Sequence, residues 1–278
     1  MKPGTESQTA VMVAAARAAA HGRTAVTAFA DPTALSLLPA DARQRVEQHL
    51  AGVPPKGLRE RLERKLLVGR VKMMVPRTVA IDAAIREAAS PQLVILGAGL
   101  DGRAWRMPEL ANTTVFEVDH PDSQRRKRER VASLQLAARE LRFVPVDFTR
   151  DRLEDALAAA GHDPTQATTW VWEGVVMYLE RADIEATLGV VQARSAPGSQ
   201  LAILYTSPSL VRAAAGFALG LIGEPFRSAF SAEQMRTLLA GFGFSVVHDH
   251  DLAYIATRLG TDSSRLFKDV RLMSAVLR

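Results

Sequence analysis

The sequence predicts an α/β protein: a doubly wound, mostly parallel sheet with helices on both faces, preceded by a helical cap. From Gln92 onward, short apolar runs alternate with helical stretches, as in parallel sheets that are buried on both sides. A glycine-rich turn directly follows the first apolar run, and an acidic residue ends the second run. The chain has 278 residues, of which 47% are hydrophobic, so a sizeable core is expected.

We expect a single domain over 1–278, divided into a helical cap, 1–90, and an α/β core, 91–278. The cap shows the helical spacing of leucines, for example Leu58 and Leu62, and contains no stretch that resembles a strand. The division therefore predicts that the chemistry lies in the core and that the cap covers it.

Seven strands are predicted in the core. A helix over 181–194 fits between the fourth and fifth strands, and Pro197 marks its end. Another helix begins at Ser231, whose side chain can form a capping box with Gln234. The predicted strands span residues 93–96, 114–118, 142–146, 169–172, 200–205, 244–247 and 272–277.

An apolar insertion over about 206–230 follows the fifth strand. Phe217, Leu219 and Leu221 lie in it, and long excursions of this kind after a strand often serve a site. Two interpretations stay open: a lid over a substrate pocket, and an extra helix packed on the body.

The composition excludes several classes of protein. The chain has no cysteine, which excludes disulfide scaffolds, thiolate zinc sites, iron–sulfur clusters and cysteine nucleophiles, and favours a cytoplasmic location. The most apolar uncharged run, 213–223, is shorter than the roughly 20 residues that cross a bilayer. We therefore expect no membrane partner.

A basic run over 125–130 has two interpretations. The formal charge of +5 and the pI of about 9.9 fit an anionic substrate or a nucleic acid. Val131 and Leu134 recur behind the run at helical spacing, which favours a solvated helix face. No aromatic residue is interleaved to stack on bases, so nucleic acid is not the expected partner.

The segment LVILGAGLDGR carries the main functional signal. Gly97, Gly99 and Gly102 lie between a buried strand and a helix, where backbone N–H groups can approach a ligand without a side chain in the way. Asp119 ends the next strand, 22 residues after Gly97, where an acid accepts hydrogen bonds from ribose hydroxyls. The arrangement predicts a nucleotide-type ligand, and the alternative is a tight strand-to-helix turn.

These glycines alone do not identify the nucleotide, because they also satisfy the GxGxxG pattern of NAD-dependent oxidoreductases. About 90 residues precede the turn, whereas a dinucleotide fingerprint usually opens its domain. The sequence also lacks a Tyr-x-x-x-Lys pair for proton transfer. Both observations favour a different cofactor and leave hydride transfer open as an alternative.

Four separated motifs resemble a known family. VILGAGLDGRAWRM, VFEVDHP, FVPVDF and WVWEGVVMYL are similar, in this order, to the S-adenosylmethionine-dependent methyltransferases of the leucine carboxyl methyltransferase type and their bacterial relatives. The resemblance extends back to SQTAVMVAAARAAA and PRTVAIDAAI, so it covers most of the chain. It implies the seven-stranded class I methyltransferase fold, with Rossmann-like topology and an antiparallel last strand, and S-adenosyl-L-methionine as cofactor.

The resemblance also assigns residues to the cofactor. Arg77 would grip the carboxylate of the methionine portion, a role that suits a planar bidentate donor, and Glu173 would lie beside the same portion. The alternative for Arg77 is an ion pair with Asp82 on its own helix. The implied cofactor-binding residues are Arg77, Gly97, Ala98, Gly99, Asp119, Asp147, Phe148 and Glu173.

The adenosine side of the implied site rests on three of these positions. Asp119 would hold both ribose hydroxyls. Asp147 would accept from the exocyclic amine of adenine, and the backbone N–H of Phe148 would donate to the ring. The alternative for Asp147 is a cap for the helix that begins near Asp151. Gly102 departs from the family, which commonly has threonine there, and this predicts a looser turn without one hydroxyl contact.

The implied reaction is O-methylation, most simply of a carboxylate on a small molecule or a peptide end. A carboxylate is ionised at neutral pH and needs no general base, whereas a hydroxyl needs one, and the sequence offers no unambiguous base. Tyr178 and Tyr205 follow the ends of strands four and five, where either could orient an acceptor or simply pack in the core. His248 and His250 share a strand face, but a metal site there lacks a third ligand, so no metal is expected.

Three alternatives to this function stay open. The first is an NAD-dependent oxidoreductase, and the second is an RNA-binding or RNA-modifying protein that works through the basic run. The third is a cofactor-binding relative without activity. Binding of labelled cofactors tests the first, and salt-dependent RNA binding tests the second. An intact cofactor site beside a filled acceptor pocket would favour the third.

Overall fold

The computed structural model describes residues 7–147, 150–208, 226–262 and 264–278. Its centre is a seven-stranded sheet with the strand order β3-β2-β1-β4-β5-β7-β6. Strands β1 to β5 run parallel to one another, whereas β7 is antiparallel to both β5 and β6. The prediction of a mostly parallel, doubly wound sheet with an antiparallel last strand is confirmed. The strands are β1 (Gln92–Leu96), β2 (Thr114–Asp119), β3 (Glu140–Pro145), β4 (Thr168–Trp172), β5 (Gln200–Thr206), β6 (Phe244–Asp251) and β7 (Val270–Leu277).

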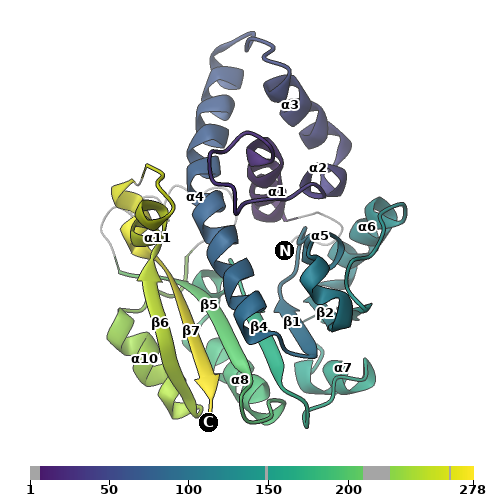
Figure 1. Ribbon diagram of the computed structural model, residues 1–278, viewed down its shortest axis with the longest axis vertical. Helices are drawn as coiled ribbons and strands as arrows, with labels where there is room; N and C mark the ends of the chain where they lie inside the picture. Colours follow the sequence, from purple (N-terminus) through teal and green to yellow (C-terminus); the bar gives the residue numbers. More distant parts are fainter. Residues whose placement is uncertain (1–6, 148–149, 209–225, 263) are drawn as a thin grey trace.

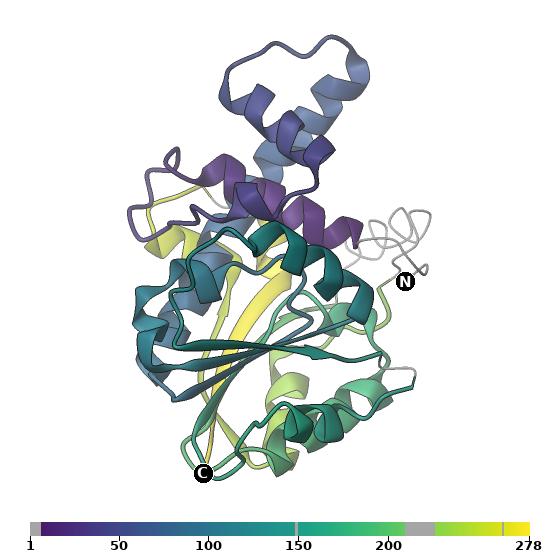
Figure 2. The ribbon, with the colours of Figure 1, turned by 90° about the vertical axis from the view of Figure 1, so that its right-hand side faces the viewer.

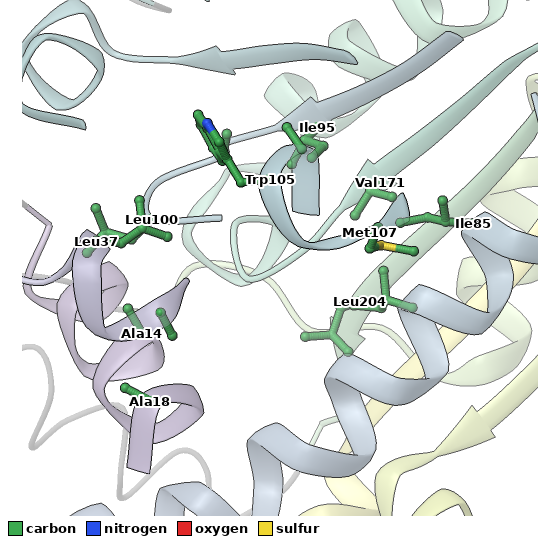
Figure 3. Packing of buried hydrophobic residues seen from close by; sticks show 14 of the residues in the cluster. Ala14, Ala18, Leu37, Ile85, Ile95, Leu100, Trp105, Met107, Val171 and Leu204 are labelled. Carbon is green, nitrogen blue, oxygen red and sulfur yellow. The ribbon is translucent and has the colours of Figure 1, made fainter. Parts of the chain in front are cut away.

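Helices cover both faces of the sheet (Figure 1; Figure 2). Successive side chains of β1 alternate between two hydrophobic clusters: Leu93 and Ile95 face one, and Val94 and Leu96 face the other. The first cluster, part of which Figure 3 shows, packs under α1 (Gln8–Ala20), α2 (Ala34–Leu37), α3 (Ala40–Leu50), α4 (Leu58–Ala88), α5 (Arg103–Arg106), α6 (Pro121–Val131) and α11 (Leu252–Arg258). The second packs under α7 (Leu153–Ala159), α8 (Arg181–Ala193) and α10 (Ala232–Gly241).

Helix α4 belongs to both the cap and the core. Its C-terminal half is buried from Met74 to Ile85 and contacts β4, β5 and β7. Its N-terminal half stands with α3 beyond the rest of the molecule (Figure 1; Figure 2). Pro76 lies inside the helix without ending it. The cap and core that we expect to divide at residue 90 therefore share one 31-residue helix.

Two predicted helix boundaries are confirmed closely. Helix α8 covers all but the last residue of the predicted range. Helix α10 begins after Ser231, and its capping box with Gln234 is present in both directions.

The C-terminal elements depart from the sequence prediction. Strand β6 continues four residues past its predicted end, with a bulge between Val246 and His248, because β7 pairs with it over its whole polar half. Helix α11 follows directly and was not predicted, since Asp251 both ends the strand and caps the helix at the backbone N–H of Tyr254.

Most of the insertion predicted over 206–230 lies outside the described residues, so neither the lid nor the packed helix is tested. Its last part is described: Arg227 donates its backbone N–H to the carbonyl of Met177, and Phe230 donates to that of Thr206. The insertion therefore returns beside the turn that follows β4. None of the helices in the described ranges combines the length and apolarity of a membrane span.

Candidate cofactor site

The glycine turn after β1 is fastened to the end of β2. Gly97 and Gly99 have φ angles of 70° and 49°, in the region that favours glycine, and a side chain at Gly97 would overlap Val175. The backbone N–H groups of Gly97 and Ala98 both donate to the carbonyl of Val118, at 2.8 and 3.0 Å. The turn is thus bound to the end of β2 at the carboxyl edge of the sheet. Because the N–H groups of Gly97 and Ala98 are bound within the protein, the approach of the turn's N–H groups to a ligand stays a prediction.

Asp119 lies directly against this turn. Its Oδ2 accepts a 2.5 Å hydrogen bond from the backbone N–H of Gly99, and its Oδ1 accepts one of 2.6 Å from that of His120. Both bonds fix the carboxylate at the end of β2, where its remaining lone pairs can accept from hydroxyl groups. The structure therefore brings together the glycine turn and the acid that the sequence singled out.

Asp147 lies in the turn after β3, the next strand of the sheet. Its backbone N–H donates to the side chain of Asp151, and its carbonyl accepts from the backbone N–H of the same residue at 2.8 Å. Helix α7 begins at Leu153, so Asp147 does not cap it, and the capping alternative is wrong. Phe148 lies outside the described residues.

Arg77 and Glu173 form a buried ion pair. The Nε atom of Arg77 lies 2.5 Å from Oε1 of Glu173, and both side chains are less than a tenth exposed. Gly174 follows with a φ of 74°, and a Cβ there would lie 2.8 Å from Nη2 of Arg77. The alternative pair between Arg77 and Asp82 is wrong, because the carboxylate of Asp82 is bound by two other arginines.

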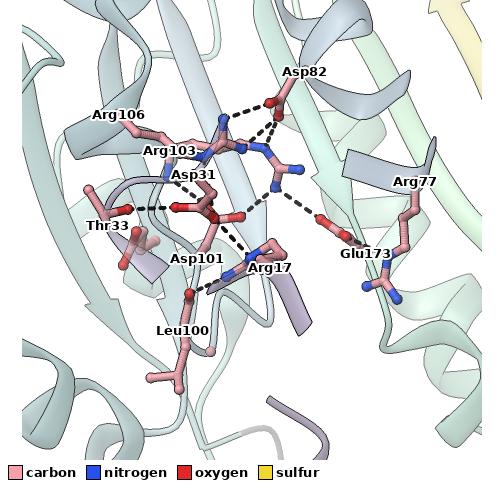
Figure 4. Close-up of polar contacts among 12 residues, drawn as sticks. Arg17, Asp31, Thr33, Arg77, Asp82, Leu100, Asp101, Arg103, Arg106 and Glu173 are labelled. Carbon is pink, nitrogen blue, oxygen red and sulfur yellow. Dashed lines mark hydrogen bonds and ion pairs between the residues drawn. The ribbon is translucent and has the colours of Figure 1, made fainter. Parts of the chain in front are cut away.

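These residues belong to a buried network of charges that sequence reasoning missed (Figure 4). Arg103 is its centre: it donates to Asp82 at 2.7 Å, to Asp101, and to Glu173 at 2.9 Å. Four arginines and four acids take part, so their formal charges balance, and none of the eight side chains is more than 9% exposed. The members are Arg17, Asp31, Arg77, Asp82, Asp101, Arg103, Arg106 and Glu173.

The network joins the cap to the sheet edge. Arg17 of α1 lies 3.0 Å from Asp31 and donates a 2.5 Å hydrogen bond to the carbonyl of Leu100, in the glycine turn. Ala10 of the same helix packs against Gly99, whose added Cβ would lie 3.1 Å away. A lone arginine in an alanine-rich helix was the one sequence signal for this contact.

The network also fixes the charge of Glu173. Burial alone would raise the pKa of Glu173, but the guanidinium groups of Arg77 and Arg103 outweigh it and lower the pKa to about 2. For Asp101, burial is likewise outweighed, chiefly by Arg103, and its pKa lies well below its usual range. Both carboxylates are therefore ionised at neutral pH.

Gly102 has a different role from the one predicted. A side chain at this position would overlap the hydroxyl of Thr33, which comes from the cap and donates a 2.9 Å hydrogen bond to Asp31. The turn is therefore not loosened. Thr33 fills the space beside Gly102 with a hydroxyl that is bound to Asp31, and the missing hydroxyl contact to a ligand stays a prediction.

The two tyrosines lie in different environments. Tyr178 stacks on Phe226 with 5.5 Å between ring centroids, where the insertion returns. The side chain of Tyr205 is fully buried, and its hydroxyl lies between Asp249 and Arg271, each at 3.1 Å. Burial and the charge of Asp249 raise the pKa of Tyr205. The structure thus favours core packing for Tyr205, and a role of Tyr178 in orienting an acceptor stays a prediction.

His248 and His250 stack on one face of β6, with 6.0 Å between ring centroids, as their spacing predicted. In the described part of the chain, no group of three side chains suited to a metal includes them. His250 also stacks on Tyr254 of α11, with 4.4 Å between ring centroids.

The basic run belongs to α6, and part of it points inward. Lys127 is 1% exposed, forms a 2.6 Å ion pair with the equally buried Glu117, and lies over the ring of Trp105. Burial raises the pKa of Glu117 to about 7, although the charge of Lys127 opposes this. Arg130 donates to the carbonyl of Leu37 at 3.0 Å. Lys127 and Arg130 therefore connect α6 to the sheet and to the cap, whereas Arg125 and Arg128 are exposed.

Comparison with known proteins identifies the family. The family model described as leucine carboxyl methyltransferase matches residues 10–192. The chain belongs to the leucine carboxyl methyltransferase family. It is 36% identical over 195 residues to a Mycobacterium protein (strain KMS) named as an S-adenosyl-L-methionine-dependent methyltransferase; the match covers 70% of this chain and 64% of that protein. A protein of the same name from Frankia alni is 34% identical over 230 residues, which cover 80% of this chain and 78% of the relative.

Solved structures of low sequence identity support the fold alone. A DUF574 family protein from Streptomyces avermitilis superposes with a TM-score of 0.60 at 13% identity and covers 98% of both chains. A Thermobifida fusca protein described as a methyltransferase gives 0.57 at 16% identity, covering 88% of this chain and 92% of that one. The predicted family and the predicted class I methyltransferase fold are both confirmed.

Proposed function

We propose that this family member is an S-adenosyl-L-methionine-dependent methyltransferase whose acceptor is a carboxylate on a small molecule or a peptide end. The single observation that supports it most is the carboxyl edge of the sheet. The glycine turn, Asp119, Asp147 and Glu173 lie at or just after the ends of the neighbouring strands β1, β2, β3 and β4, and Arg77, from the interior of α4, pairs with Glu173 there. Two relatives named as S-adenosyl-L-methionine-dependent methyltransferases support S-adenosyl-L-methionine as the cofactor.

The residues at this edge match the chemical groups of the cofactor. Three acids suit the ribose hydroxyls, the adenine amine and the ammonium group, and one arginine suits the carboxylate. Within the described residues, Arg77 makes its hydrogen bond through Nε, so its two terminal nitrogens are left for a bidentate contact. Glu173 is the partner that orients this guanidinium.

The charge state of the site favours a carboxylate acceptor over a hydroxyl. S-adenosyl-L-methionine, when bound, supplies a methyl group on a positively charged sulfur. Glu173, with a pKa of about 2, is a weak proton acceptor at neutral pH and poorly suited to activate a hydroxyl. A carboxylate is already ionised and needs only to be held in line with the methyl carbon, with water excluded.

The test is a panel of matched acceptors, each carboxylic acid paired with the alcohol or phenol of the same skeleton. After incubation with the cofactor carrying a labelled methyl group, mass spectrometry reads the methyl gain. We expect gains on acids only, and alkali should release the label as methanol, because a methyl ester is hydrolysed and a methyl ether is not. Alkali-stable labelling of the alcohols or phenols would contradict the carboxylate acceptor.

A further inference from the structure

The N-terminal half of α4 and the loop before it form a projecting surface, residues 53–72, which we call the basic tip. Figure 1 and Figure 2 both show α3 and this half of α4 standing clear of the sheet and its covering helices. The tip is far from the network of buried charges and takes no part in the candidate cofactor site. Its side chains therefore need a separate explanation.

The basic tip carries the whole net charge of the chain. It contains seven Lys and Arg residues and two acids, so its formal charge is +5, the same as that of all 278 residues. The rest of the chain is balanced. Both acids already have partners inside the tip: Glu63 pairs with Arg59 at 2.9 Å, and Glu60 accepts from the backbone N–H of Lys56 at 2.7 Å.

The same surface exposes a stripe of leucines. Leu58, Leu62 and Leu66 are 84%, 58% and 47% exposed, and their spacing of four places them along one face of α4. On the opposite side of the helix, Leu67 and Val71 pack against the core. Among the described residues, eight large hydrophobic side chains are exposed, and five of them lie in the tip: Val53, Leu58, Leu62, Leu66 and Val68.

Cations border the stripe on both sides. Arg61 and Lys65 each follow a stripe leucine by three residues and line one side, whereas Arg59 lies on the other. Their aliphatic stems can lie along the leucines while the charged groups point outward. A soluble polyanion would bind the charges but leave the leucines in water. A second copy of the tip would bring like charges together.

We propose that the basic tip is a docking surface for an anionic lipid bilayer. An apolar stripe flanked by cations fits the boundary between anionic headgroups and acyl chains, where leucines enter and arginine and lysine bind phosphate. Leu66 precedes Arg77 by eleven residues of the same helix, a rise of about 17 Å. Docking through the stripe would therefore hold the candidate cofactor site about this far from the bilayer along the helix. The expectation of no membrane partner, which concerned spanning segments, is replaced by surface binding.

The test is co-sedimentation of the full chain with vesicles of phosphatidylcholine alone or with a third of phosphatidylserine, at low and high salt. We expect binding to the anionic vesicles only, weakened by salt. The charge variant Lys56→Gln/Arg61→Gln/Lys65→Gln should bind about 100-fold more weakly, since each basic residue contributes a factor of about five. The leucine variant Leu58→Ser/Leu62→Ser/Leu66→Ser should also lose binding.

A matched control removes the same charge elsewhere. Arg152→Gln/Arg181→Gln/Arg236→Gln replaces three exposed arginines outside the tip and should bind like the wild type. Circular dichroism of each variant checks that it folds. Equal weakening by the control variant, binding that survives both tip variants, or no binding to anionic vesicles would overturn the proposal. So would a vesicle-free dimer that the leucine variant dissociates, because the stripe would then join two copies.

Discussion

At the scale of single residues, some side chains at the site fill space that a neighbouring glycine leaves free. Gly102 and Thr33 are the clearest pair, because the hydroxyl of Thr33 fills the place of a side chain at Gly102. The backbone at Gly102 has a φ of −115°, so a threonine is excluded there by contact and not by conformation.

We therefore expect Gly102→Thr alone to destabilise the protein by about 1–3 kcal/mol through overpacking. Combined with Thr33→Ala, the same change should cost at least about 1 kcal/mol less than the sum of the two single changes, because the new hydroxyl can replace the lost one beside Asp31. Urea unfolding of the four proteins measures this coupling. Additive changes would show that the two residues do not share the space.

The lowered pKa of Glu173 predicts that the unfolding free energy depends on pH. Its pKa is lowered from an ordinary value of 4.5 to about 2, so the folded state holds the ionised form more strongly than the unfolded state does. This shift contributes about 3 kcal/mol to the unfolding free energy. The contribution is fully present above pH 4.5 and is lost as the pH falls toward 2. In Glu173→Gln this part is missing, so the gap in unfolding free energy between wild type and variant should narrow between pH 5 and pH 3. A constant gap would contradict it.

At the scale of elements, charged side chains join segments that are distant in sequence. Asp82 of α4 holds two arginines that follow the glycine turn: Arg103 at 2.7 Å, and Arg106 at 2.6 Å. Both partners are buried, so removing the acid leaves buried positive charge without compensation.

Asp82→Asn should therefore lower the unfolding free energy by about 3–5 kcal/mol. The matched control is Asp41→Asn in α3, where the pair with Arg45 is more than half exposed on both sides and should contribute less than about 1 kcal/mol. Thermal or urea unfolding compares the two. Similar effects for both variants would mean that the buried network does not couple α4 to the turn.

The elements also show what a sequence can and cannot predict. Strands β1, β2 and β4 were predicted within one residue, because they are buried on both faces and appear as uninterrupted apolar runs. The end of β6 was not predicted, since its pairing with β7 is what extends the strand through its polar half to Asp251. The ion pair of Arg77 and Glu173 joins residues 96 positions apart, and no local pattern encodes such a contact.

At the scale of the whole molecule, the fold places its chemistry at one edge and its net charge at one end. The glycine turn and Glu173 contact the cap through Arg17, Ala10 and Arg77, and the buried charges hold the cap in place. The basic tip extends from the same cap on α4. The long helix thus links a candidate cofactor site to a candidate docking surface through one rigid element.

The most direct test of the proposed cofactor is calorimetric titration of the purified protein with S-adenosylhomocysteine and, separately, with NAD. We expect the first to bind and to raise the unfolding free energy by about 2.7 kcal/mol at a hundred times its Kd, and the second not to bind. Asp119→Ala should weaken binding by about 1–3 kcal/mol, and Asp155→Ala, an exposed acid of α7, should not. Binding of NAD in place of S-adenosylhomocysteine, or binding that Asp119→Ala leaves unchanged, would contradict the account.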